Sequence, residues 1–102
     1  MPVYNKIVRD KIPDIIRNEK RNCNIKILSD KDAVNLLSQK ILEEADEFLK
    51  EPSKEEMADI FEILHSIIKK YNWTYDEIEK IRINKANKNG SFDKNIFLID
   101  TD

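Results

Sequence analysis

The chain has little of what builds disulfide-linked, turn-rich or membrane-spanning proteins. Cys23 is the only cysteine among 102 residues, which excludes an internal disulfide and a cysteine-based zinc cluster. One glycine and three prolines argue against an all-β sandwich with many tight turns. No apolar run approaches the roughly 18–20 residues that span a bilayer, and the start MPVYNKIVRDK has no apolar leader. We therefore expect a cytoplasmic protein with no membrane association.

The composition is that of one small, highly charged domain. Hydrophobic residues make up 40% of the chain and charged residues 37%. A chain of 102 residues has room for one modest core, so we expect a single helical domain over residues 1–102. Small helical proteins of this composition often complete their core by oligomerising. The fold class expected is mainly all-α, an antiparallel helical bundle with a small two-stranded accessory.

Periodicity and capping residues predict where the helices lie. In the stretch RDKIPDIIRNEK, Asp10 is the expected N-cap of a short helix with Pro13 in its first turn. The three longer helices are expected over residues 31–50 after Ser29 or Asp30, 54–71 after Ser53, and 75–89 after Thr74. Pro52 and Gly90 are the expected stops. The β-branched or apolar stretches at 24–28 and 95–99 predict two short strands.

Charge is distributed unevenly along the chain. The net charge is −2, yet residues 1–28 carry seven Lys and Arg against three Asp and Glu. Residues 29–59 carry four against ten. With this charge balance we expect the protein not to bind DNA or RNA, because nucleic-acid binders carry a dominant basic surface. Two ordinary solvated faces would explain the same counts.

The carboxylates of the second and third predicted helices should meet. At 100° per residue, Glu44 and Glu47 belong to an acidic stripe that abuts the apolar face of the helix over 31–50 on one side. On the helix over 54–71, Glu56 lies within the apolar arc and Asp59 at its edge. The short connection around Pro52 predicts an antiparallel pair, which brings these ends together. Crowded, partly desolvated carboxylates are costly, and a hard divalent cation relieves the cost. Exposed acids paired with nearby lysines are the simpler alternative.

Two groups of residues carry a resemblance that covers nearly the whole chain. Glu43-Glu44-Ala-Asp-Glu47 followed by Glu56-Met-Ala-Asp59 resembles the EExxE…ExxD signature of the MazG-like, all-α nucleoside triphosphate pyrophosphohydrolases. The opening YNKIVRDKIP, residues 4–13, resembles the start of a small branch of that superfamily labelled phosphoribosyl-ATP pyrophosphohydrolase-like. The segment KANKNGSF, residues 85–92, resembles that branch's KAxxRGGF segment, although Asn89 stands where arginine is frequent.

The resemblance implies a reaction and a set of residues. Members of the superfamily use Mg²⁺ to cleave a nucleoside triphosphate to the monophosphate and pyrophosphate, and they are commonly homodimers or homotetramers. We treat Mn²⁺ as an alternative ion. By motif position the metal ligands would be Glu44, Glu47, Glu56 and Asp59, and Glu43 would help to position a water molecule or a further ion. Candidate phosphate-binding cations are Arg9, Lys11, Lys40, Lys85 and Lys88.

Three functions therefore stand open at the level of sequence. The first is a Mg²⁺-dependent pyrophosphohydrolase that removes surplus or non-standard nucleotides. The second is phosphoribosyl-ATP hydrolysis, and the third is a non-catalytic, metal-binding helical interaction module. The preferred base, the number of metal ions and the choice between dimer and tetramer are not encoded in any motif. Trp73, Tyr75 and His65 are expected to be packing or surface residues rather than ligands.

Overall fold

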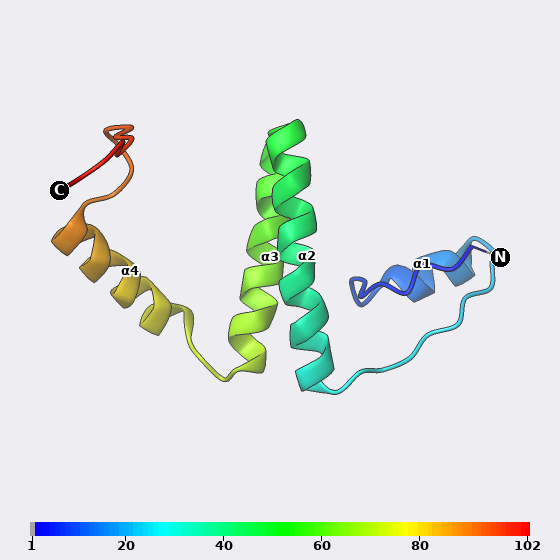
Figure 1. Cartoon of the computed structure of the whole chain (residues 1–102). Helices are drawn as coiled ribbons and strands as arrows, with labels where there is room; N and C mark the ends of the chain where they lie inside the picture. The colour runs from blue at the N-terminus through cyan, green and yellow to red at the C-terminus, as the bar shows by residue number, and fades with distance from the viewer. Residues whose placement is uncertain (1) are drawn as a thin grey trace.

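The computed structural model describes residues 2–102, and its regular elements are all helices. They are α1 (Ile12–Asn18), α2 (Asp30–Lys50), α3 (Lys54–Lys70) and α4 (Tyr75–Asn89). α2 and α3 stand side by side as an antiparallel hairpin, while α1 and α4 extend away on opposite sides of it (Figure 1). The chain is consequently elongated, with principal extents of 60 × 32 × 26 Å. No described helix combines the length and the hydropathy needed to cross a bilayer.

Side-chain caps start the three long helices as the sequence predicts. The hydroxyl of Ser29 accepts a hydrogen bond from the backbone N–H of Asp32, and Ser53 and Thr74 cap α3 and α4 in the same way. Each cap satisfies one of the N–H groups left free in a first helical turn. Gly90, with φ of 89°, ends α4 in a conformation that glycine adopts without steric cost. The predicted bounds of these helices are confirmed to within about one residue.

Two local predictions are corrected. The N-cap of α1 is Lys11 rather than Asp10, and no side chain caps this helix. Neither residues 24–28 nor residues 95–99 form a strand in the described chain. The first segment precedes α2 and the second follows α4, on opposite sides of the hairpin (Figure 1). Since a strand needs a neighbour to accept its hydrogen bonds, their β-branched composition alone does not make a sheet.

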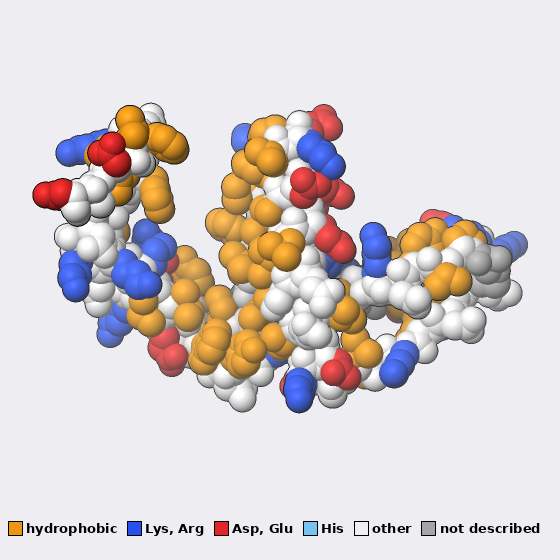
Figure 2. Space-filling view, in the orientation of Figure 1, with side chains coloured by type: hydrophobic (Ala, Val, Ile, Leu, Met, Phe, Trp, Pro, Cys, Tyr) orange, Lys and Arg blue, Asp and Glu red, His pale blue; other side chains and the backbone are white. Residues whose placement is uncertain are grey.

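The hairpin holds the core that the described residues form. Ala33 and Leu37 of α2 and Ile63 of α3 are the buried apolar side chains within residues 2–102. Other apolar side chains of the hairpin are half-buried, such as Val34 and Ile67, and Phe61 is 65% exposed. Hydrophobic side chains line the edge of the hairpin that faces α4, whereas the visible surface of α4 itself carries many Lys and Arg side chains (Figure 2). The chain by itself therefore buries only a small part of its apolar surface.

Candidate metal centre

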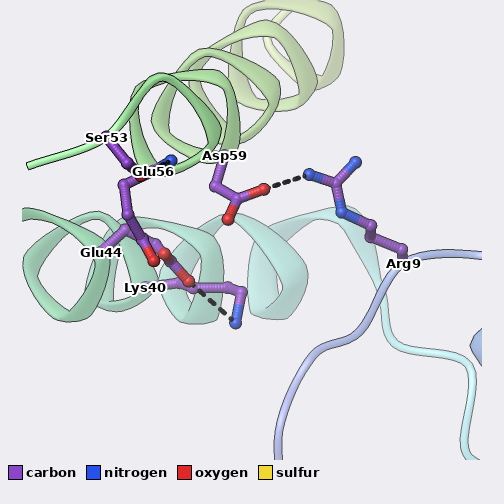
Figure 3. A network of polar contacts seen from close by, with 6 residues as sticks. All are labelled: Arg9, Lys40, Glu44, Ser53, Glu56 and Asp59. Carbon is purple, nitrogen blue, oxygen red and sulfur yellow. Dashed lines mark hydrogen bonds and ion pairs between the residues drawn. The ribbon is translucent and has the colours of Figure 1, made fainter. Parts of the chain in front are cut away.

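Carboxylates from both helices of the hairpin converge near the turn between α2 and α3. Glu44 of α2 and Glu56 and Asp59 of α3 each offer one oxygen, and these three oxygens lie within 4.8 Å of one another. All three residues are half-buried. Figure 3 shows the side chains of Glu44 and Glu56 pointing toward each other, with Asp59 one turn further along α3. The connection of only three residues, 51–53, brings these two helix ends together.

The local sequence places Glu56 in the first turn of α3. Its backbone N–H donates to the Ser53 hydroxyl at 3.1 Å, so the cap that starts the helix also holds the backbone of this acid (Figure 3). The positive end of a helix dipole favours a carboxylate at this position. Yet the Oε2 atom of Glu56 is buried and has no hydrogen-bond partner among the described residues. A buried, unpaired carboxylate oxygen is costly, and it marks the place where a cation would be most stabilising.

The electrostatics of the cluster agree with this geometry. Partial burial raises the pKa of the Glu56 carboxyl above its ordinary value, contact with Glu44 raises it further, and the nearby charges of Glu47 and Asp59 act in the same direction. A raised pKa means that the carboxylate form of Glu56 is disfavoured where it lies. Carboxylate oxygens are the ligands that Mg²⁺ and Mn²⁺ prefer, so the donor set fits a hard divalent cation.

Two cationic side chains contact the cluster from different parts of the chain. Arg9, in the segment before α1, lies with its Nη2 atom 2.8 Å from Oδ1 of Asp59, fifty residues away in sequence (Figure 3). Lys40 lies one turn before Glu44 on α2, with its Nζ atom 3.8 Å from Oε1 of Glu44. The Arg9–Asp59 pair is partly exposed, with 60% and 42% of the two side chains accessible, so it adds little stability by itself. The pair nevertheless shows that the N-terminal segment lies beside α3 of the hairpin at this point.

The other predicted site residues are placed differently. Glu47 does not belong to the group of three converging oxygens, although its charge influences Glu56. Glu43 lines a small cavity against the N-terminal segment. Lys11 is the N-cap residue of α1. Lys85 and Lys88 belong to α4, which extends away from the hairpin, so the fold of one chain does not bring them to the carboxylates (Figure 1).

Sequence reasoning overlooked one cation near the cluster. Lys6 lines the same cavity as Glu43 and Lys40, beside the hairpin. The signal that could have identified it was its position three residues before Arg9, on the same basic segment. Charge counts alone could not single it out among seven basic residues in the first 28.

Together the fold and the cluster define a helical hairpin with a carboxylate-rich candidate metal centre at its turn. No known protein-family model, curated protein sequence or solved structure matches this chain.

Proposed function

We propose that the protein is a Mg²⁺-dependent nucleotide pyrophosphohydrolase that cleaves a nucleoside triphosphate to the monophosphate and pyrophosphate. The observation that carries the proposal is the convergence of Glu44, Glu56 and Asp59, with an unpaired, buried oxygen on Glu56. The resemblance of these residues to the EExxE…ExxD signature supplies the reaction. The basic side chains beside the acids suit an anionic substrate.

The residues divide naturally into two roles. Glu44, Glu56 and Asp59 would hold the cation, with Glu47 as a further ligand from the next turn of α2. When bound, the divalent ion neutralises phosphate charge and polarises the phosphorus. Arg9 and Lys40 would bind phosphate oxygens, because their charged groups already contact the carboxylates that would hold the metal. Lys11, Lys85 and Lys88 remain proposed phosphate contacts. Lys85 and Lys88 belong to α4, which would have to lie beside the carboxylates for these lysines to reach the substrate.

The hydrolytic step itself requires a water molecule and a proton acceptor. Water attacks the α-phosphorus, the bond to the oxygen bridging the α- and β-phosphorus breaks, and pyrophosphate leaves. The proton of the attacking water passes to a carboxylate, for which Glu43 is the candidate beside the cluster. A chain with these residues needs no His or Cys for the reaction.

We also propose that the protein acts as a homodimer or homotetramer. α1 has seven residues and α4 fifteen, and isolated helices of such lengths are marginal in water. α4 carries Ile78, Ile81 and Ile83 with 37%, 55% and 43% of their surface exposed. Covering these side chains with a second copy would complete the core that one chain lacks.

The test of the function is pyrophosphate release. Purified protein is incubated with a panel of nucleoside triphosphates and phosphoribosyl-ATP, with Mg²⁺ or with EDTA. We expect release that depends on Mg²⁺ and that falls at least about a hundredfold in Glu56→Gln, because a ligand rather than a supporting group is lost. Glu55→Gln is the matched control, since Glu55 is the exposed neighbour in the same helical turn and outside the converging group.

Each arm of this experiment separates the alternatives. Release from phosphoribosyl-ATP alone would identify phosphoribosyl-ATP hydrolysis as the function instead of general nucleotide hydrolysis. No release from any substrate, with Mg²⁺ binding intact, would overturn the hydrolase and favour a metal-binding interaction module.

A further inference from the structure

A small cavity, open to solvent, lies between the N-terminal segment and α2 beside the candidate metal centre. The cavity has a volume of about 70 Å³. Its polar lining consists of Asn5 and Lys6 from the N-terminal segment and Gln39, Lys40 and Glu43 from α2, and Ile7 and Leu36 form its apolar lining. A pocket for a whole drug-sized ligand is larger, on the order of 300–1,000 Å³. The size therefore suits one phosphate group and not a complete nucleotide.

The cavity is linked to the carboxylate cluster through Lys40 and, along the chain, through the segment that contains Arg9. On α2, Lys40 lines the cavity and also contacts Glu44 of the cluster at 3.8 Å. On the N-terminal segment, Lys6 lines the cavity, and Arg9, three residues later, contacts Asp59 at 2.8 Å. One end of a polyphosphate chain could thus enter the cavity while the other end approaches the metal centre.

Of the two lysines that line the cavity, Lys6 has no partner for its charge among the described residues. Arg9 pairs with Asp59 and Lys40 with Glu44, whereas Lys6 forms no ion pair within residues 2–102. Asn5 also lines the cavity. It has a φ of 49°, a left-handed conformation that asparagine tolerates better than most residues and that turns the backbone at this point. A lysine whose three N–H donors are free is a suitable group to bind an anion.

We infer that this cavity is a phosphate subsite in which Lys6 binds one phosphate group of a di- or triphosphate. The inference rests on the proposed function, because it assigns a terminal phosphate of that substrate. Glu43 also lines the cavity, and its carboxylate repels a free anion. Phosphate binding should consequently require a divalent cation at Glu44, Glu56 and Asp59, which offsets the local negative charge.

The test measures the binding of pyrophosphate to the whole chain by isothermal titration calorimetry, in Mg²⁺ and in EDTA. We expect binding in Mg²⁺ that Lys6→Gln weakens roughly tenfold or more, since a charge-assisted hydrogen bond is lost. Lys6→Arg should retain most of the affinity. The matched control is Lys94→Gln, which removes the same charge from an exposed position beyond α4. Lys6 is itself exposed, so its replacement leaves the fold intact.

Mg²⁺ binding, measured separately in each variant, keeps the two proposals distinguishable. Pyrophosphate affinity that is unchanged in Lys6→Gln, with Mg²⁺ binding intact, would overturn the subsite and leave the metal centre standing. Pyrophosphate binding that is equally tight in EDTA would overturn the requirement for the cation, and with it this form of the subsite. If the native chain binds Mg²⁺ but no pyrophosphate, the subsite is wrong. If it binds no Mg²⁺ and releases no pyrophosphate from any triphosphate, the proposed function fails as well.

Discussion

The α2–α3 hairpin and the two outer helices differ in how far they bury their apolar side chains. In the hairpin, two long capped helices pack against each other, and only 8% of the surface of Leu37 in α2 and 5% of that of Ile63 in α3 remains exposed. In α4, Ile81 is 55% exposed, and neither α1 nor α4 contains a buried residue. The difference shows that one chain supplies the partner for α2 but not for α4. One sequence thus contains a hairpin with a small buried core, which carries the acids, and outer helices whose apolar side chains stay at least partly exposed in the single chain.

The largest effect on stability is expected in the hairpin. Ile63→Ala should lower the free energy of unfolding by about 2–5 kcal/mol, because it removes buried methylene groups and leaves a cavity. Ile63→Val, which removes one methylene group, should cost about 0.5–1.5 kcal/mol. Chemical denaturation followed by circular dichroism measures both values. A loss in Ile63→Ala no greater than that in Ile63→Val would show that the hairpin core is not packed as described.

A smaller effect is expected when a residue of the exposed apolar surface is replaced. This effect is on self-association, so it depends on protein concentration. Phe61 of α3 is 65% exposed in the single chain. Phe61→Glu should weaken self-association by roughly ten- to a hundredfold, since a phenyl ring buried in a contact contributes about 1.5–3 kcal/mol. Light scattering after gel filtration measures the oligomer over a range of concentrations. Glu62→Gln, at the neighbouring exposed position, is the control. A native chain that stays monomeric at all concentrations would contradict the proposed oligomer.

The smallest effect is expected on thermal stability when a carboxylate of the cluster is neutralised, and it depends on pH. Because the pKa of Glu56 is higher in the folded chain than in the unfolded chain, the folded state binds the proton more tightly. The resulting destabilisation is absent below the ordinary pKa of Glu56, grows as the pH rises through the raised folded pKa, and then stays constant. In EDTA, Glu56→Gln should therefore raise Tm at pH 7 and leave it nearly unchanged near pH 4. Calorimetry over this range measures the difference. A gain that is equal at both values of pH would assign the effect to packing instead of charge.

Much of the fold could be predicted because it depends on neighbours in sequence. Ser29, Ser53 and Thr74 cap their helices with their own hydroxyl groups, and such contacts need no distant partner. The short connection at Pro52 makes α2 and α3 antiparallel, and helical spacing then brings Glu44, Glu56 and Asp59 together. The strands expected at 24–28 and 95–99 are wrong for the described chain because strand pairing is a long-range event.

Capping, periodicity and a three-residue turn are enough to predict the bounds of the three long helices, the hairpin, and the convergence of Glu44, Glu56 and Asp59, although Glu47, which was also expected there, lies outside this group. Tertiary contacts, in contrast, place Arg9 against Asp59 and bring Lys6 and Lys40 to the same cavity. The tertiary arrangement also directs the helix that carries Lys85 and Lys88 away from the acids. Local rules cannot set such placements, because contacts between residues fifty positions apart depend on the path of the whole chain between them.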